Sequence, residues 1–375
     1  MDVLTELKES VAGRVSKALS DIGAEVTPDQ VEVSLRTTPS HGDLSTAVCF
    51  KFASILSTSP HDLANRIASD IEKPELIAEV RATNGYLNFF VDWQSFSRRV
   101  IGQILREGAA YGREDRRRGV LVLEHTSVNP TGPLNIARSR NSIIGDSLAR
   151  IFAHQGWDVH RCYLLNDVGH QVVTILWGRR KGLFSKELEN TYQRYASKKD
   201  FKVFFTYVPA VARAREDPEA QREVSELESK VHRDMDLLDE LTEISKECLE
   251  GQLETLSRLG IEFDEITPES QFIRDGSLEG VLSRLRETGI LVENPDGSVG
   301  MDLSRLGLKR RKSEFVTLVK ADGSSTYTLR DIAYHEWKFK RGDRFVTVLG
   351  EDHKREFTEL KAAPVSYTHL RAHET

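Results

Sequence analysis

The pattern of apolar and polar positions predicts a parallel α/β unit in the middle of the chain. Residues 119–124 (GVLVLE) form an almost continuous apolar run, which is typical of a strand buried on both faces. After a loop rich in proline and glycine, apolar residues recur at helical spacing from Ile136 to Phe152, and Gly156 is a suitable helix stop. Residues 157–165 supply a second strand. Strand, helix and strand at this length predict a right-handed parallel unit.

A similar succession of elements returns late in the chain. Residues 324–329 (SSTYTL) have the composition of a strand, and Asp331 to Arg341 is predicted to be a helix stopped by Gly342. Residues 344–350 (RFVTVLG) form another predicted strand. Two such halves indicate an α/β fold with a Rossmann-like doubly wound parallel sheet. Ligands of such sheets bind beyond the carboxyl ends of the strands, near the point where the strand order reverses.

The flanking segments divide the chain further. Residues 1–112 are predicted to be an N-terminal α+β domain, in which residues 85–93 (GYLNFFVDW) form a strand. A second domain is expected to cover residues 113–364, with an insertion at about 179–300. Within it, residues 218–259 combine dense charge with apolar residues at helical period, which predicts two long helices with a solvated charged face.

Composition narrows the class of protein. The 375 residues suffice for two to three domains, and 39% hydrophobic with 29% charged residues is typical of a soluble globular protein. The formal charge of −6 provides no global basic field, so contacts to nucleic acid must come from local patches. Three scattered cysteines lack zinc-ligand spacing, so no metal site is expected, and they favour a reducing compartment. No signal-peptide core and no apolar window of membrane-spanning length occur, and we expect a cytoplasmic protein.

Candidate chemistry begins at the loop after the first buried strand. Residues 124–135 are rich in Pro, Gly, Ser and Asn and lead into a helix, where backbone N–H groups and the positive end of the helix dipole favour phosphate. Many loops end in a capped helix, so the loop alone is a weak signal. Further polar residues, Asn166, Asp167 and Gln171, follow the second strand.

Three motifs in this order resemble the arginyl-tRNA synthetases, a family of class I aminoacyl-tRNA synthetases. They are EHTSVNPTGPL from residue 124, SRNSIIGD from residue 139 and YLLNDVGHQ from residue 163. The resemblance covers about residues 1–364 and includes the later segments LVKADGSSTYTLRDIAYHEWKF and VLGEDHKREF. It implies a monomeric enzyme that uses ATP with Mg²⁺ to activate arginine as arginyl-adenylate, and then transfers the arginine to tRNA(Arg).

The resemblance implies a pocket for the arginine side chain. Glu124, Tyr327 and Asp331 are expected to form it, because a guanidinium group is matched by carboxylates and planar acceptors. Each residue also has a structural alternative. Glu124 can pair with a neighbouring arginine, Asp331 can be a helix N-cap, and Tyr327 can be a core residue of a strand.

The rest of the amino acid is assigned by the same resemblance. Ser127 and Asn129 are expected to hold its head group, with Asp352 nearby. The loop of Asn166 and Asp167 is expected to surround the substrate. Gln171 either contacts the guanidinium or caps a helix.

The chain departs from the family at its first signature. In place of the family's His-x-Gly-His it has Asn135, Ile136, Ala137 and Arg138. Asn135 can donate one neutral hydrogen bond, Ala137 adds a methyl group where adenine is expected to lie, and Arg138 remains a phosphate donor. Loss of one preorganised donor commonly lowers a rate by about 10²–10³-fold. Asn135 and Arg138 are the candidate catalytic residues.

ATP is therefore assigned to two segments of the chain. Asn135, Ala137 and Arg138 are expected on the phosphate and adenine side. Gly350 and His353 are expected to approach the adenosine, although His353 can equally be a histidine at a helix start.

Contacts to RNA are expected in two places. Tyr86 and Asn88 match an aromatic residue and an amide that the family places on the tRNA D-loop, and stacking with edge hydrogen bonds is how unpaired bases are recognised. A half-buried strand tyrosine is the structural alternative. The run from Lys309 to Lys312 either meets the acceptor arm or is a solvated turn.

The end of the chain differs from the family pattern. Pro364 interrupts a helix, and residues 365–375 look like the translation of a sequencing adapter, so we expect a non-native tail. The family continues with a lysine-containing mobile loop and an anticodon-binding domain, and without them we expect little or no activity. Two other functions stay open: a catalytically inactive paralogue that binds tRNA or nucleotide, and a ligase or nucleotidyltransferase that acts on a small molecule.

Overall fold

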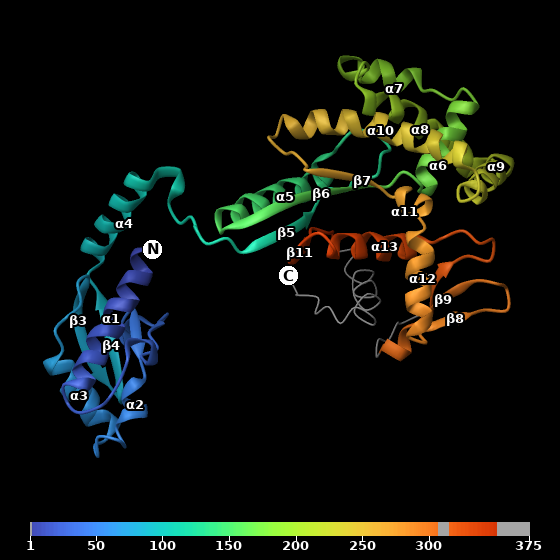
Figure 1. Cartoon of the computed structure of the whole chain (residues 1–375). Coiled ribbons are helices and arrows are strands. Elements are labelled where there is room, and N and C mark those ends of the chain that lie inside the picture. The colour runs from blue at the N-terminus through green and yellow to red at the C-terminus, as the bar shows by residue number, and fades with distance from the viewer. Residues whose placement is uncertain (1, 307–314, 351–375) are drawn as a thin grey trace. The chain divides into compact units, whose positions relative to one another are not determined.

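The computed structural model describes residues 2–306 and 315–350. The chain divides after Arg113 into two compact units, residues 1–113 and 114–375 (Figure 1).

The first unit is an α+β domain, as predicted. Its antiparallel sheet has the strand order β1-β2-β4-β3. The elements are α1 (Val3–Ser20), β1 (Ser34–Leu35), β2 (Leu44–Thr46), α2 (Val48–Phe52), α3 (Pro60–Asp70), β3 (Ile77–Thr83), β4 (Tyr86–Val91) and α4 (Trp93–Glu107). The helix α1 follows an Asp2 N-cap and buries Val11, Val15 and Leu19 against the sheet's apolar face, so its sequence periodicity is that of one buried stripe.

The second unit is built on a parallel sheet with the strand order β11-β5-β6-β7. From β5 the chain proceeds to β6 and β7 on one side, and it returns to β11 on the other side of β5. The strand order therefore reverses between β5 and β11. This confirms the predicted doubly wound sheet, and it identifies the edge where ligands of such folds bind.

The elements of the second unit follow in chain order. They are β5 (Gly119–Glu124), α5 (Ile136–His154), β6 (Trp157–Leu165), α6 (His170–Arg180), α7 (Lys186–Thr191), α8 (Lys199–Glu216), α9 (Pro218–Lys230), α10 (Met235–Ser257), β7 (Glu265–Pro268), α11 (Gln271–Arg274), α12 (Ser277–Glu287), β8 (Leu291–Glu293), β9 (Val299–Asp302), β10 (Phe315–Val319), α13 (Tyr327–Phe339) and β11 (Arg344–Thr347). Among the described residues, no helix combines the length and apolarity that crossing a membrane requires.

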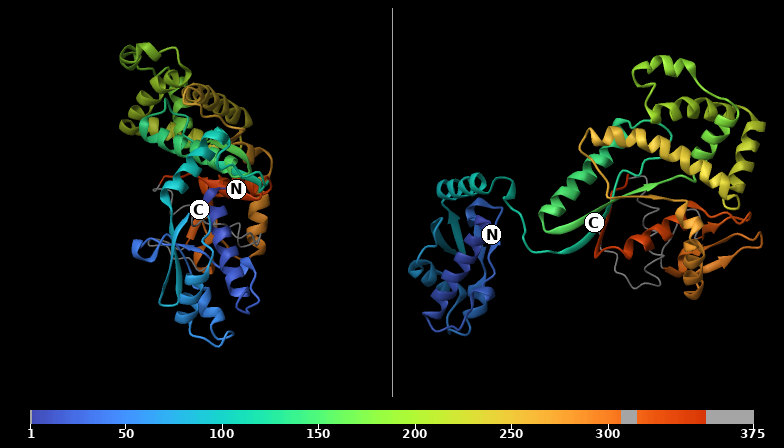
Figure 2. Two further views of the ribbon diagram at one scale, coloured as in Figure 1. Left: turned by 90° about the vertical axis from the view of Figure 1, so that its left-hand side faces the viewer. Right: turned by 45° about the horizontal axis from the view of Figure 1, so that its top comes forward.

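Helices cover both faces of the parallel sheet. The green α5 and the red-orange α13 lie on opposite sides of it in Figure 1 and in the right view of Figure 2. Alternate residues of β5 serve the two faces: Leu121 and Leu123 pack with Ala149 of α5, whereas Val122 packs in the cluster of α13. Glu124 lies two residues after Val122, so the last side chain of β5 is directed to the α13 face.

The predicted insertion is shorter than expected. The assigned range of 179–300 includes β7, which is a strand of the parallel sheet, so the helical part ends before Glu265. The two long helices predicted over residues 218–259 are α9 and α10.

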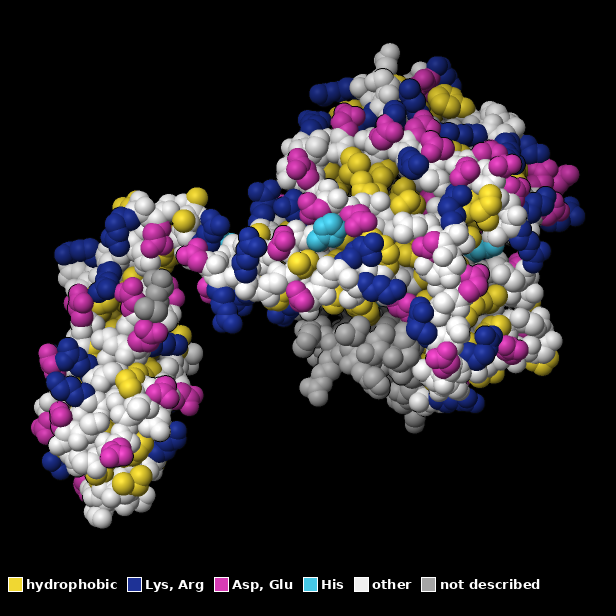
Figure 3. Space-filling model, viewed as in Figure 1, with side chains coloured by type: hydrophobic (Ala, Val, Ile, Leu, Met, Phe, Trp, Pro, Cys, Tyr) yellow, Lys and Arg dark blue, Asp and Glu magenta, His cyan; other side chains and the backbone are white. Residues whose placement is uncertain are grey.

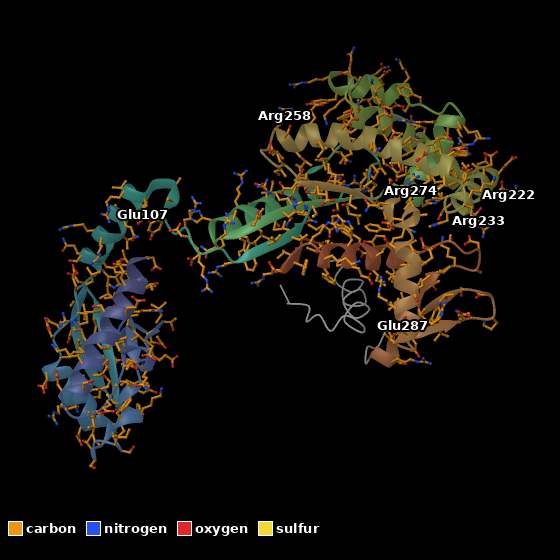
Figure 4. All side chains as sticks on the ribbon, viewed as in Figure 1. Glu107, Arg222, Arg233, Arg258, Arg274 and Glu287 are labelled. Atoms are coloured by element: carbon orange, nitrogen blue, oxygen red, sulfur yellow. The ribbon has the colours of Figure 1, made fainter. Side chains whose placement is uncertain are left out.

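Basic and acidic side chains alternate over this region in Figure 3, and Arg274, labelled in Figure 4, pairs with Asp239 of α10 at 2.7 Å. The charged side chains of this surface are exposed to solvent and pair with one another.

The strand predicted at residues 324–329 is wrong. The segment follows β10, the edge of a small antiparallel sheet with the order β10-β9-β8, and Asp322 accepts hydrogen bonds from Ser324 in a turn. Thr326 is the N-cap residue of α13, and Tyr327 is its first helical residue. Asp331 therefore lies inside the helix and is not its cap. The turn at Asp322 leaves too few residues for a further strand.

His125, the residue after β5, is part of the packing between β5 and α5. Its side chain is 1% exposed, and its ring lies 4.7 Å from the ring of Phe263. A Cβ atom on Gly145 of α5 would come within 2.2 Å of the imidazole, so only glycine permits this approach. Burial lowers the pKa of His125 to about 4, and the histidine is therefore a neutral core residue.

We predict that replacing His125 with Phe flattens the pH dependence of stability. Because the folded-state pKa is below the ordinary value of 6.5, the unfolded chain binds the proton more readily, and stability is lost as the pH falls from 6.5 towards 4. The loss from this group at pH 5 is about 2 kcal/mol. Urea denaturation between pH 5 and 7.5 measures it, and His125→Phe should lose less stability than the wild type. Equal losses in the two proteins would contradict a buried neutral His125.

Candidate active site

The loop after β5 has a strained backbone at the edge where the strand order reverses. Thr126 and Ser127 have φ values of 72° and 41°, in the left-handed region that non-glycine residues rarely adopt. Ser127 is held there because its hydroxyl donates to Glu124 Oε1 at 3.2 Å and accepts from the backbone N–H of Leu164 at 3.1 Å. Strain of this kind is maintained by surrounding contacts and is common at functional sites.

Two buried polar side chains fix the rest of the loop. The hydroxyl of Tyr163 on β6 accepts from the backbone N–H of Val128 at 3.1 Å and donates to its carbonyl at 2.9 Å. The amide of Gln252 on α10 donates to the carbonyl oxygens of Gly132 at 2.8 Å and Asn129 at 3.3 Å. The loop is therefore held by the sheet and by the insertion.

The loop ends at the N-terminus of α5, where the altered signature lies. Asn135 is the N-cap residue, and its side-chain oxygen accepts from the backbone N–H of Arg138 at 2.9 Å. Asn135, Ile136 and Ala137 are exposed, and Arg138 is half-buried. One of the N–H groups at the helix start is thus occupied within the protein, while the N–H groups of the first turn have no partner within a helix and are suited to an anion.

The residues assigned after β6 have separate roles. The side-chain N–H of Asn129 donates to Gln171 Oε1 at 2.9 Å, so these two predicted substrate residues lie together. Gln171 does not cap α6, whose N-cap residue is Gly169. Asp167 is fully buried and accepts from the N–H and hydroxyl of Ser270 at 2.8 and 2.6 Å. Asp167 therefore supports the turn after β7.

The two predicted acidic residues belong to one polar network on the α13 face. Lys338 Nζ lies 2.5 Å from Glu124 Oε2 and 3.2 Å from His335 Nε2. His335 Nδ1 lies 3.2 Å from Asp331 Oδ1. Glu124 pairs with a lysine, and not with an arginine as the structural alternative supposed. Glu124 and Asp331 are connected by polar side chains and are not separated by packed hydrocarbon.

Helical spacing explains this arrangement. Tyr327, Asp331, His335 and Lys338 follow one another at intervals of four, four and three residues, which places them along one face of α13. Tyr327 is 41% exposed at the helix start and is therefore not a core strand residue. His335 and Lys338 were missed from the sequence, although their spacing from Asp331 was the signal that would have identified them.

A second buried ion pair supports the start of α13. Arg330 Nε lies 2.8 Å from Glu269 Oε1, and both side chains are buried. Arg330 also donates to the carbonyl oxygen of Ser325 at 2.7 Å, which holds the segment before the helix. Burial raises the pKa of Glu269, against the lowering effect of Arg330. This pair, also missed from the sequence, orients the helix that carries Tyr327 and Asp331.

Of the remaining residues of the second unit that are predicted to contact substrate or RNA, only Gly350 belongs to the described part of the chain. Gly350 lies three residues after β11, where the backbone N–H of Val348 donates to the carbonyl of Glu124 at 2.9 Å. Asp352, His353 and the run from Lys309 to Lys312 lie outside the described residues. Within residues 2–306 and 315–350, no group of three or more His, Cys, Asp or Glu side chains is arranged to hold a metal ion.

In the first unit, Tyr86 and Asn88 line one cavity of about 270 Å³. The cavity is also lined by Arg36, His41, Ser45, Thr83 and Asn84. Tyr86 is 36% exposed, and the guanidinium of Arg36 lies 5.6 Å from its ring centroid. Asn88 is buried on β4, between β2 and β3. An aromatic face with an adjacent arginine is a suitable surface for a stacked base.

Comparisons with known proteins agree with this geometry. Residues 100–362 match the catalytic domain of the class I tRNA synthetases (R), and residues 6–91 match the arginyl-tRNA synthetase N-terminal domain. The arginine–tRNA ligase of Methanothermobacter thermautotrophicus is 36% identical over 93% of this chain and 59% of its own length. That of Methanocella arvoryzae is 37% identical over 94% of this chain and 60% of its own length.

A solved structure gives the same result. The arginyl-tRNA synthetase of Thermus thermophilus superposes with a TM-score of 0.58 at 28% identity, over 88% of this chain and 53% of that one. The chain thus spans about 60% of the length of the curated relatives it matches. The matched regions include the loop after β5, the start of α5 and the polar face of α13. The chain belongs to the arginyl-tRNA synthetases, the class I tRNA synthetases designated R.

Proposed function

We propose that this chain carries the arginine-activating site of an arginine–tRNA ligase. The reaction joins arginine to ATP as arginyl-adenylate and transfers the arginine to tRNA(Arg). The observation that carries the proposal is the network of Glu124 and Asp331 beside the strained loop and the α5 N-terminus, at the edge where the strand order reverses. The network is suited to a cation and the start of α5 to an anion, and both follow strands of the sheet at the edge where ligands of such folds bind.

The chemistry needs positioning more than a reactive side chain. The arginine carboxylate attacks the α-phosphorus of ATP and pyrophosphate leaves, so the rate depends on alignment and on stabilising the charge of the phosphate oxygens. The start of α5, with Asn135 and Arg138, is the proposed phosphate side, and Ala137, Gly350 and His353 are the proposed adenosine side. Mg²⁺ enters as the counter-ion of the ATP phosphates.

The amino acid is assigned to the neighbouring residues. Tyr327 and Asp331 receive the guanidinium together with Glu124. Ser127 and Asn129 hold the head group with Asp352, and Asn129 is oriented by its hydrogen bond to Gln171. We also propose that the protein is a monomer and that it is cytoplasmic. The free, buried thiol groups of Cys49, Cys162 and Cys248 are suited to a reducing compartment.

We predict that Asp331→Asn weakens binding of a sulfamoyl analogue of arginyl-adenylate by about 10- to 100-fold, because a charged hydrogen bond becomes neutral. Titration calorimetry measures the affinity. Asp158→Asn is the matched control, since Asp158 is exposed at the amino end of β6 and lies at the opposite edge of the sheet. The wild type should prefer the arginyl to the lysyl analogue, and equal affinity for both would refute the arginine pocket.

The altered signature motivates one alternative, a paralogue that binds nucleotide or tRNA without catalysis. The side-chain oxygen of Asn135 is occupied in capping α5, and the residue carries no positive charge. Arginine-dependent exchange of labelled pyrophosphate into ATP separates the alternatives, when it is measured with tRNA present on a protein that also carries the family's lysine-containing loop and anticodon-binding domain. Exchange supports the ligase, whereas tight binding of the adenylate analogue without exchange supports the paralogue.

We further propose that the first unit contacts tRNA through Tyr86 and Asn88. Tyr86→Ala should weaken tRNA binding by about 5- to 100-fold, because stacking of one base contributes about 1–3 kcal/mol. Tyr86→Phe keeps the aromatic face and should bind nearly as well as the wild type. Filter binding with tRNA(Arg) measures both variants, and equal losses in the two would show that the hydroxyl, and not stacking, makes the contact.

A further inference from the structure

Lys338 is a buried cation next to a site that is proposed to bind a cation. Its side chain is 2% exposed, and its ammonium group lies 2.5 Å from Glu124 Oε2, 3.2 Å from His335 Nε2 and 3.3 Å from Thr347 Oγ1. The ring of Tyr334 lies 4.5 Å below it. Three acceptors and an aromatic face thus surround a group with three N–H donors, so the ammonium is fully accommodated.

The hydrogen bonds assign the proton of the neighbouring histidine. Because Lys338 donates to His335 Nε2, that nitrogen accepts and the ring proton is on Nδ1. Nδ1 faces the carbonyl oxygen of Asp331 at 2.9 Å and its carboxylate at 3.2 Å. One network therefore orients both carboxylates: Glu124 directly, and Asp331 through His335.

The charges explain why a lysine belongs here. Two carboxylates in one buried network repel each other, and a cation between them reduces this repulsion. Counted at their formal charges, the three described side chains Glu124, Asp331 and Lys338 sum to one negative charge. The adjacent Arg330 and Glu269 cancel each other. One negative charge matches one guanidinium group.

We propose that Lys338 is a positioning residue for arginine: its ammonium orients Glu124 directly and Asp331 through His335, and it offsets the formal charge of one of these two carboxylates. This inference rests on the proposed function. It differs from the simpler view that the ammonium occupies the place of the substrate on Glu124. The two views predict opposite changes in arginine affinity when the ammonium is removed.

The test is arginine binding by titration calorimetry to the full chain and its variants. Lys338→Ala removes three methylene groups and the ammonium, which n-propylammonium can replace. We expect Lys338→Ala to bind arginine about tenfold or more weakly and to recover most of the affinity when n-propylammonium is added. Lys338→Met fills the space without charge, so it should be equally weak and should not recover. Lys340→Ala is the matched control, because Lys340 is exposed at the end of α13.

Each outcome has a distinct meaning. Absence of arginine binding by the wild type would overturn the proposed function itself. Wild-type binding with unchanged or tighter binding by Lys338→Met would overturn the positioning role, and tighter binding would show that the ammonium competes with the substrate. Melting curves of every variant show whether it is folded. If Lys338→Ala does not fold, the comparison of Lys338→Met with Lys340→Ala decides.

Discussion

The ion pair between Glu124 and Lys338 is the interaction on which the second unit's site depends. Glu124 ends the first strand of the parallel sheet, and Lys338 lies on the helix that leads into the last strand, more than two hundred residues later. The pair joins these distant segments at the edge where β5 and β11 lie side by side. A carboxylate and an ammonium group that are both buried tolerate little displacement, because either one alone would be an uncompensated charge. The pair therefore fixes the geometry of this edge of the sheet.

Two further constraints act around this pair. On one side, Tyr163 and Gln252 satisfy the backbone of a loop that contains left-handed Thr126 and Ser127. On the other side, Arg330 and Glu269 hold the start of α13. The site thus consists of three rigid parts, each stabilised by buried polar groups with partners. Such an arrangement suits a reaction whose rate depends on alignment of two substrates.

The regular elements of this fold could be predicted from local patterns. The apolar run of β5 and the helical spacing of α9 and α10 each report the environment of their own residues, and these predictions are confirmed. The strand at residues 324–329 could not be judged locally, since the turn at Asp322 decides where α13 begins. The wrong helix boundary then gave Asp331 the alternative role of a cap. Motifs predicted residues for the site, but the pairing of Glu124 with Lys338 is a tertiary contact that no spacing in the sequence records.

The anchoring of the loop by Gln252 has a consequence for how proteins of this design can vary. A helical insertion between two strands can ordinarily be replaced more easily than other segments, because the strands of the sheet pair without it. Here one amide from the C-terminal part of α10 supplies donors to two carbonyl groups of the loop after β5. If a shorter or unrelated insertion replaced this one, those two carbonyl groups would lose their hydrogen-bond donor inside the protein. Sequence variation in α10 is therefore restricted at Gln252, because this residue holds the loop after β5, although no residue of α10 is proposed to contact a substrate.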